Sequence, residues 1–217
     1  MKCYNKTYKN YDLILESELQ KIVESGKTPT LLLHACCAPC SSAVLERISK
    51  YFKITILYYN PNIAPKAEFD KRVNELDKFL KEFKTDNKVE LIEDYYDYSE
   101  YTNAVKGLEH LGERSKRCYE CYKLRMERCA KYAKENNFDY FTTTLSISPY
   151  KDSNWINEIG SMLEEKYNVK YLYADFKKKN GYLRSIKLSH EYNLYRQGYC
   201  GCAYSYEEYQ KRISSKD

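Results

Sequence analysis

The sequence predicts an α/β protein in which a mostly parallel sheet of about five strands is covered by helices and followed by a helical C-terminal extension. Short apolar runs of strand length alternate with amphipathic segments of helical period, and this alternation is typical of parallel sheets. No internal repeat, low-complexity tract or long linker divides the 217 residues. That length suits one substantial domain.

The first elements lie before residue 36. Residues 10–25 space their apolar side chains at helical intervals, and Gly26 follows as a stop signal. The segment TPTLLLHA, at 28–35, is typical of a short buried strand. We therefore expect a helical extension at 1–28 in front of a single α/β domain at 29–217, which includes the cysteine-bearing C-terminal segment.

A β-α-β unit comes next. Residues 41–52 are amphipathic, with Ser41 or Ser42 available as an N-cap, and KITILYY at 53–59 is again of strand length. The later segments continue the alternation. They are a loop at 60–65, helices at 66–83, 118–137 and 153–168, strands at 89–94, 139–144 and 170–176, and a C-terminal portion from 177 that is helical at both ends around a cysteine-bearing turn.

The composition narrows the class of protein. A core of this size needs no disulfides, so stability does not explain nine cysteines. We find no signal-peptide pattern at the amino terminus and no apolar run of about 18 residues, so we expect a cytoplasmic protein with no membrane partner. In the cytosol, grouped cysteines are more often metal ligands or redox groups than bridges. The net charge of +5 permits a polyanionic partner without requiring one.

The first cysteine group is HACCAPCSS, at 34–42, which contains Cys36, Cys37 and Cys40. It follows a predicted strand and precedes a predicted helix, the position where open α/β sheets usually carry their functional sites. A helix N-terminus lowers thiol pKa values and favours bound anions. The alternative is that the three thiols are buried and only structural. The placing of three cysteines within five positions around a proline disfavours this alternative.

The second group is RCYECYKLR, in which Cys118 and Cys121 are three residues apart at the start of a helix. Two such thiols face one way and can bind one metal or form a redox disulfide. Cys129, further along the same helix, is expected in the core, and Cys3 is expected to be incidental.

The third group is YCGCAYS, with Cys200 and Cys202 flanking Gly201. This spacing is too tight for a relaxed bridge, and a strained disulfide is easily reduced, which suits a redox relay. Metal binding by the pair and a reduced structural turn are the alternatives.

The first two groups together could supply four thiolates to one centre, which fits tetrahedral zinc or a 4Fe-4S cluster. Their location at the functional edge favours a working cofactor.

Four motifs in this order resemble the QueH-type epoxyqueuosine reductases: HACCAPCSS, KRCYECYKLRME, FDYFTTTLSISPYKD and YRQGYCGCAYS. The resemblance covers residues 31–205. It implies a nucleotide-binding-like fold of the HUP or PP-loop type and an oxidoreductase that converts epoxyqueuosine, at the wobble position of tRNA, to queuosine. It also implies an electron donor, whose identity the sequence does not indicate.

The same resemblance implies roles for individual residues. Cys36, Cys37, Cys118 and Cys121 would hold a 4Fe-4S cluster, while Cys200 and Cys202 would form a redox-active disulfide. A second, mononuclear iron is associated with the family, and Cys40 is a candidate ligand by position.

Other residues are candidates from their chemistry. His34 could donate a proton or could be a hydrogen-bonded strand-end residue, and Asp152 has the same ambiguity. The basic residues around the second cysteine group, together with 177–179 and 184–196, suit tRNA phosphates or are solvated helix faces. They include Arg114, Lys116, Arg117, Lys123, Arg125 and Arg128. The 25 tyrosines are a compositional bias or stacking partners for bases.

Two alternative functions belong to other classes. An ATP-dependent tRNA thiolation or adenylating enzyme could use a related fold, but no Gly-rich phosphate loop follows the first strand. A zinc-stabilised RNA-binding module would need no redox pair and would show no turnover.

Overall fold

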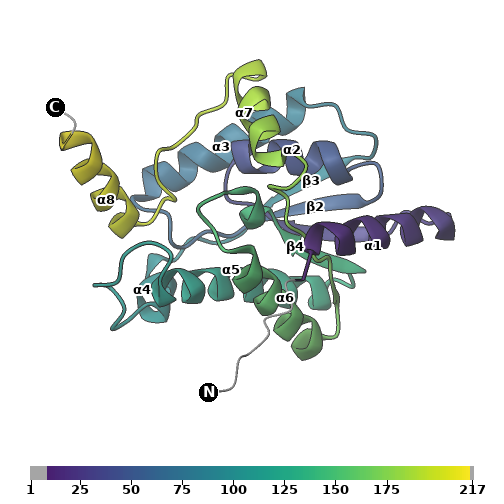
Figure 1. Ribbon diagram of the computed structural model, residues 1–217, viewed down its shortest axis with the longest axis horizontal. Helices are drawn as coiled ribbons and strands as arrows, with labels where there is room; N and C mark the ends of the chain where they lie inside the picture. Colours follow the sequence, from purple (N-terminus) through teal and green to yellow (C-terminus); the bar gives the residue numbers. More distant parts are fainter. Residues whose placement is uncertain (1–8, 216–217) are drawn as a thin grey trace.

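The computed structural model describes residues 9–215 and contains one five-stranded, all-parallel sheet in the order β3-β2-β1-β4-β5 (Figure 1). The predicted fold class is thereby confirmed. The strands are β1 (Thr30–His34), β2 (Lys53–Tyr58), β3 (Val89–Glu93), β4 (Tyr140–Thr143) and β5 (Lys170–Tyr171). Residues 1–8 of the predicted extension and residues 216–217 of the predicted domain lie outside the described residues, and so does Cys3, for which an incidental role was expected.

The central strand β1 pairs with β2 on one side and β4 on the other, so that Leu32 lies between Thr55 and Phe141. The chain therefore runs outward from β1 to β3 on one side and resumes at β4 on the other. In open α/β sheets, the crevice at such a switch point, outside the carboxyl ends of the strands, is where ligands bind. The first cysteine group lies there, because it directly follows β1.

The helices lie close to their predicted positions. They are α1 (Tyr11–Ser25), α2 (Ala38–Ile48), α3 (Lys66–Glu82), α4 (Tyr98–Ala104), α5 (Lys116–Glu135), α6 (Ser153–Tyr167), α7 (Gly181–Glu191) and α8 (Ala203–Ser214), with a short 3-10 helix, η1 (Thr144–Ile147). As predicted, Gly26 ends α1 in the left-handed conformation, with φ 64°.

The predicted N-cap of α2 is wrong. Ser41 and Ser42 lie inside the helix, which begins at Ala38 with Cys37 in the capping position and Pro39 in its first turn. The Ser41 hydroxyl donates a hydrogen bond to the Cys37 carbonyl at 2.9 Å, four residues back, instead of accepting one from a free N–H. The cysteine group therefore forms the first turn of α2 itself.

Two further differences concern short elements. The predicted strand at 170–176 is only two residues long, because the Asn157 side chain bonds both the N–H and the carbonyl of Ala174, at 3.0 and 2.9 Å. Helix α4 was not predicted, since its tyrosine-rich sequence has no apolar period. It is capped by the Asp97 carboxylate and buries Tyr101.

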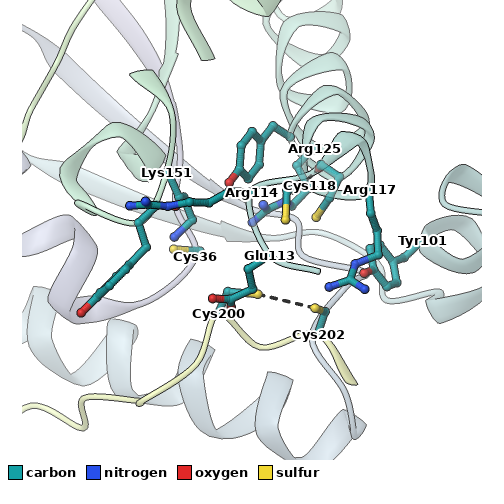
Figure 2. A pocket seen from close by; sticks show the side chains of 13 residues that line it. Cys36, Tyr101, Glu113, Arg114, Arg117, Cys118, Arg125, Lys151, Cys200 and Cys202 are labelled. Atoms are coloured by element: carbon teal, nitrogen blue, oxygen red, sulfur yellow. Dashed lines mark hydrogen bonds between the residues drawn. The ribbon is translucent and has the colours of Figure 1, made fainter. Parts of the chain in front are cut away.

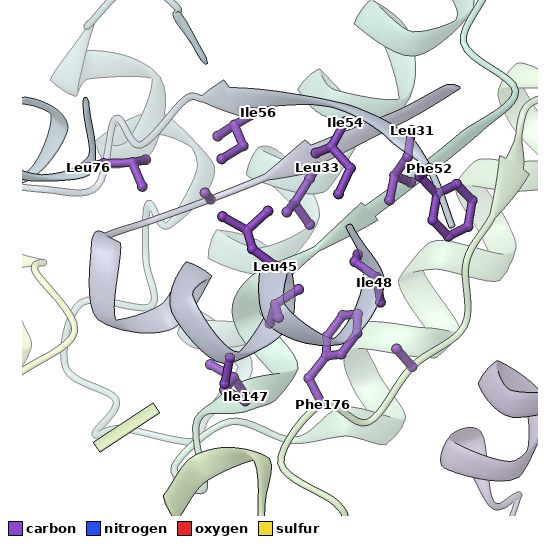
Figure 3. Close-up of a cluster of buried hydrophobic side chains, with 14 of the residues drawn as sticks. Leu31, Leu33, Leu45, Ile48, Phe52, Ile54, Ile56, Leu76, Ile147 and Phe176 are labelled. Carbon is purple, nitrogen blue, oxygen red and sulfur yellow. The ribbon is translucent and has the colours of Figure 1, made fainter. Parts of the chain in front are cut away.

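Helices cover both faces of the sheet (Figure 1). On one face α1, α2, α3 and α7 pack against alternate side chains of β1 and β2, including Leu31, Leu33, Ile54 and Ile56 (Figure 3). On the other face α5 and α6 pack against Leu32, Leu57 and Phe141. Because β1 is buried on both faces, its sequence is a continuous apolar run.

Helix α1 is attached to the same core. Leu15, Leu19 and Ile22 are buried in it, and the Arg47 guanidinium donates to Asp12 at 2.7 Å. The boundary placed at residue 28 stays a prediction. Among the helices described between residues 9 and 215, none has both the length and the apolar character needed to cross a bilayer.

Candidate active site

The three cysteine groups meet in one cavity at the carboxyl edge of the sheet (Figure 2). Five thiols line it, from Cys36, Cys118, Cys121, Cys200 and Cys202. They come from the turn after β1, the first two turns of α5 and the turn before α8. Cys36 and Cys118 are 82 positions apart in the sequence, and the first two groups were predicted to share one centre; the third group lines the same cavity.

The first group forms the tightest cluster of thiols. The Sγ atoms of Cys36, Cys37 and Cys40 all lie within 4.8 Å of one another, and those of Cys36 and Cys37 are 3.9 Å apart. Hydrogen bonds from the Cys37 and Cys40 thiols lower the pKa of Cys36 well below its usual range. The hydrogen bond with Cys36 in turn raises the pKa of Cys37 and the pKa of Cys40. The cluster therefore favours one thiolate at Cys36, stabilised by its two neighbours.

The second group lies on α5. Cys121 is buried and Cys118 half-buried, and burial raises the pKa of both thiols, that of Cys121 to about 11. A bound cation would favour their deprotonated forms. Cys129 does not face this cavity. It is fully buried behind β1, with its Sγ atom 3.8 Å from the carbonyl oxygens of Leu32 and Thr142, which fits the expected core role.

The third group caps α8. The Sγ atoms of Cys200 and Cys202 are 3.6 Å apart, and the backbone N–H of Ser205 donates to the Cys202 sulfur at 3.4 Å. The hydrogen bond with Cys202 lowers the pKa of Cys200, while that of Cys202 is raised. All eight cysteines described between residues 9 and 215 are free thiols. The predicted disulfide between Cys200 and Cys202 stays a prediction.

Cations surround these sulfur atoms. Arg125 is buried, donates to the Cys121 carbonyl at 3.1 Å, and lies in the cavity wall beside Lys151. Burial opposes the charge of both groups, but the electrostatic effect of Cys121 and Cys36 raises the pKa of Arg125, and that of Cys36 and Cys40 raises the pKa of Lys151. Both side chains are therefore cations that balance negative sulfur.

Lys151 is the residue that sequence reasoning missed. It belongs to the motif SPYKD, but a lysine in a loop carries no pattern of its own, and only the packing of this loop against the cysteine groups brings it into the site. Its neighbour Asp152 has a structural role: the carboxylate caps α6 by accepting from the backbone of Asn154 at 2.7 Å.

His34 lies beneath the cavity and does not line it. The ring is fully buried, with Nδ1 2.8 Å from the Thr143 hydroxyl and Nε2 3.2 Å from the Tyr59 carbonyl. Burial lowers its pKa to about 3, so the imidazole is neutral near pH 7. These contacts favour the strand-end role, and the catalytic role stays a prediction.

A second, more open cavity of about 320 Å³ adjoins the first and shares with it Cys36, Cys200, Lys151, Glu113 and Tyr150. Arg72, Arg196 and Arg212 also line it, so its charged residues are mainly basic.

The predicted basic cluster divides between two roles. Arg117 and Arg125 are buried in the wall of the thiol cavity, and Arg128 pairs with Asp94 at 2.6 Å, so none of these three is free to bind phosphate groups at the surface. Lys116, Lys123 and Arg114 are exposed, so they stay candidates for contacts with tRNA phosphates. Arg114 donates to the carbonyls of Pro149 and Tyr150 at 2.8 and 3.2 Å and lies over the Tyr150 ring, which is 62% exposed at the cavity mouth.

A parallel α/β domain that gathers thiols from three segments, with cations beside them, at its switch point defines a thiol-based redox or metal enzyme. The chain belongs to the epoxyqueuosine reductase QueH family, whose model matches residues 31–208. The resemblance predicted from the four motifs is confirmed, and with it the class of enzyme, an oxidoreductase.

Individual relatives agree with the family match. The chain is 41% identical over 198 residues to the epoxyqueuosine reductase QueH of Streptococcus pyogenes serotype M1, which covers 90% of this chain and 78% of that protein. The protein of the same name from Staphylococcus epidermidis is 41% identical over 200 residues, covering 90% and 84%. That from Thermotoga maritima is 37% identical over 188 residues, covering 84% and 93%. Neither the ATP-dependent enzyme nor the zinc-stabilised RNA-binding module finds support in these similarities.

Proposed function

We propose that this protein reduces epoxyqueuosine to queuosine in tRNA, in the cytoplasm, using a 4Fe-4S cluster held by Cys36, Cys37, Cys118 and Cys121. The observation that carries the proposal is the meeting of three thiol groups at one cavity beside Lys151. The relatives named above are epoxyqueuosine reductases, and tRNA is the substrate that this activity implies.

The donor set suits such a cluster: Cys36, Cys118 and Cys121 line one cavity, and Cys37 lines the adjoining cavity with its Sγ atom 3.9 Å from that of Cys36. Thiolates are the usual ligands of iron–sulfur clusters, and four of them in one place hold a 4Fe-4S centre. The thiols here are free, and Arg125 and Lys151 supply positive charge that a thiolate-rich anionic centre needs. Cys40 lies within the same group as Cys36 and Cys37, so it is available as a ligand of a second iron. When bound, these groups would relay single electrons and polarise an epoxide oxygen.

The reaction to be supported is a deoxygenation. An epoxide gains two electrons and two protons, both C–O bonds break, and an alkene and water are formed. Oxidation of two thiols to one disulfide releases two electrons and two protons, so a Cys200–Cys202 pair balances one turnover. An external reductant must then restore the two thiols.

Two features of the chain would assist this step. The oxygen gains negative charge as its bonds break, and the Lys151 ammonium group would stabilise that charge inside the cavity. The pair Cys200 and Cys202 lines the same cavity, within reach of the reacting site. We assign the electrostatic role to Lys151 and keep a proton-donating role for His34 as the weaker alternative, because both of its ring nitrogens are already engaged.

The tRNA would be held at the mouth of the larger cavity. Arg196 and Arg212 are exposed there and suit phosphate groups, as does Arg114 beside Tyr150. The exposed Tyr150 ring offers a surface on which an unstacked base can lie. A base in the anticodon loop is accessible in this way without opening a duplex.

The direct test is turnover. Anaerobically reconstituted protein is incubated with tRNA that carries epoxyqueuosine and a chemical reductant, and the tRNA is then digested to nucleosides for mass spectrometry. We expect the modified nucleoside to lose the mass of one oxygen atom, with or without ATP. An unchanged nucleoside in the presence of metal-loaded protein, or a strict requirement for ATP, would contradict the proposal.

A further inference from the structure

The turn that carries Cys200 and Cys202 is fixed to the domain by a buried arginine of α3. Arg72 is only 2% exposed, and its Nη1 atom donates to the Cys200 carbonyl at 3.1 Å. The two residues are 128 positions apart in the sequence, so this contact is a tertiary one. A guanidinium that is buried to this extent needs partners for its charge and its donors.

Glu68, one helical turn earlier, supplies the charge. Its Oε1 atom accepts from Arg72 Nε at 2.8 Å, and the ion pair is almost completely shielded from solvent. The carboxylate directs the guanidinium along α3, which leaves Nη1 to bond the turn. Burial opposes the charge of Arg72, but nearby Cys37 and Glu68 raise its pKa, so it remains a cation.

The turn is shaped to accept this contact. Gly201 has φ of 117°, a conformation that side chains disfavour, and a Cβ atom there would lie 3.0 Å from both Arg72 Nη1 and Ile63 Cγ1. The Gly201 carbonyl accepts from the Ala64 backbone at 3.0 Å. The guanidinium also lies over the Tyr199 ring, 5.4 Å from its centroid. Both sides of the turn are therefore held by α3 and by the loop before it.

We propose that Arg72 is a positioning residue that holds the Cys200–Gly201–Cys202 turn so that its two thiols face each other and form a disulfide readily. The proposal rests on the redox role given to this pair above. Removing the guanidinium frees the Cys200 carbonyl and lets the turn relax, which lowers the effective concentration of one thiol at the other. The disulfide then becomes less stable relative to the dithiol.

The test measures the equilibrium between dithiol and disulfide directly and needs neither metal nor tRNA. Metal-free, full-length protein is equilibrated in dithiothreitol buffers of defined redox ratio, alkylated and digested with trypsin. The peptide at 197–211 contains Cys200 and Cys202 and no other cysteine, so the number of labels on it reports this pair alone. The Arg72→Ala variant is expected to lower the equilibrium constant for disulfide formation about tenfold, which corresponds to about 30 mV for this two-electron couple.

Matched variants separate positioning from stability. Arg47→Ala removes a different guanidinium, which is partly buried and pairs with Asp12 and Glu16 far from the turn. This variant should destabilise the fold without changing the equilibrium between dithiol and disulfide. Arg72→Lys keeps the charge without the fork of donors and should fall between wild type and Arg72→Ala. Gly201→Ala, which crowds the same contact, should shift the equilibrium in the same direction even if Arg72→Ala does not fold.

The outcomes are distinct. If the wild-type pair forms no disulfide across the buffer range, the redox role of the pair fails and the role of Arg72 fails with it. If the wild-type pair forms a disulfide and the folded Arg72 and Gly201 variants have the same equilibrium constant, only the positioning role is overturned.

Discussion

The Sγ atoms of Cys200 and Cys202 lie 3.6 Å apart at the amino end of α8, in the same cavity as Cys36 (Figure 2). If this pair stores electrons and does not bind the cluster, replacing either thiol should separate colour from activity. We expect Cys200→Ser and Cys202→Ser to retain iron and sulfide while losing most of their turnover with a dithiol reductant. Loss of the metal from either variant would show that the pair is a ligand.

The cluster ligands should behave in the opposite way. Because a 4Fe-4S centre needs four thiolates, we expect Cys36→Ala, Cys118→Ala or Cys121→Ala to remove most of the iron and the visible absorption. Cys129→Ala is the matched control, since this thiol is buried behind β1. It should cost about 1 kcal/mol of stability for the lost contacts and leave the iron content unchanged. Iron and sulfide analysis of the four variants, with thermal unfolding, measures both effects.

Replacing Cys40 distinguishes between a packing role and a role as an iron ligand. Cys40 lies within 4.8 Å of both neighbouring thiols but is also a candidate ligand of a second iron. We expect Cys40→Ala to lose one iron while retaining sulfide. An unchanged iron count would give Cys40 a packing role, and loss of all sulfide would make it a cluster ligand.

Lys151 should contribute to turnover more than to folding. Replacing it with Met removes the ammonium group expected to stabilise the epoxide oxygen, and loss of one such interaction typically costs about 100-fold to 1,000-fold in rate. Lys134→Met is the control, because this lysine is exposed in the last turn of α5, at the end opposite Cys118 and Cys121, and it should leave turnover unchanged. Single-turnover rates of the metal-loaded proteins provide the measurement, and equal rates for Lys151→Met and wild type would exclude the electrostatic role.

Tyr150 should matter for tRNA binding. The ring is exposed beside Arg114 at the cavity mouth, and stacking on an aromatic ring is worth about 1–3 kcal/mol per base. Tyr150→Ala should therefore weaken tRNA binding by about five-fold to 150-fold, while Tyr150→Phe, which keeps the ring, should bind as wild type. Affinities measured at one fixed salt concentration test this prediction, and equal affinities for all three proteins would contradict it.

Asp152 should affect stability alone. Its carboxylate caps α6, and removal of such a cap costs about 1 kcal/mol. Asp152→Ala should lower the unfolding midpoint and leave the single-turnover rate of the folded protein unchanged. A rate that falls while stability is retained would instead give Asp152 a part in the reaction.

The sequence predicted the fold well because its strands and long helices depend on local patterns. The run Leu31–Leu33 and the apolar periods of α3 and α5 mark elements whose burial is visible in the sequence. Where tertiary contacts decide, prediction failed. Asn157 ends the last strand through its side chain. Helix α2 begins at Ala38 with Pro39 in its first turn, so Ser41 and Ser42 lie inside the helix and do not cap it.

Some residues of the site could be predicted from the sequence, whereas others could be identified only in the folded structure. The three cysteine groups were visible as motifs because thiols are rare and their spacing is short. Lys151 and Arg72 carry no such signal, since basic residues are common along this chain and only the packed structure brings these two beside the thiols. The burial of Arg117 and Arg125 was equally hidden, because a helix of mixed charges does not show which cations face inward.

The thiols gathered at this edge of the sheet are proposed to hold an iron–sulfur cluster. Anaerobic purification followed by iron, zinc and acid-labile sulfide analysis, with a visible spectrum, tests this proposal most directly. We predict brown protein with at least about four iron and about four sulfide per chain, as a 4Fe-4S centre requires. Colourless protein with stoichiometric zinc and no sulfide would show that these thiols bind zinc and no iron–sulfur cluster.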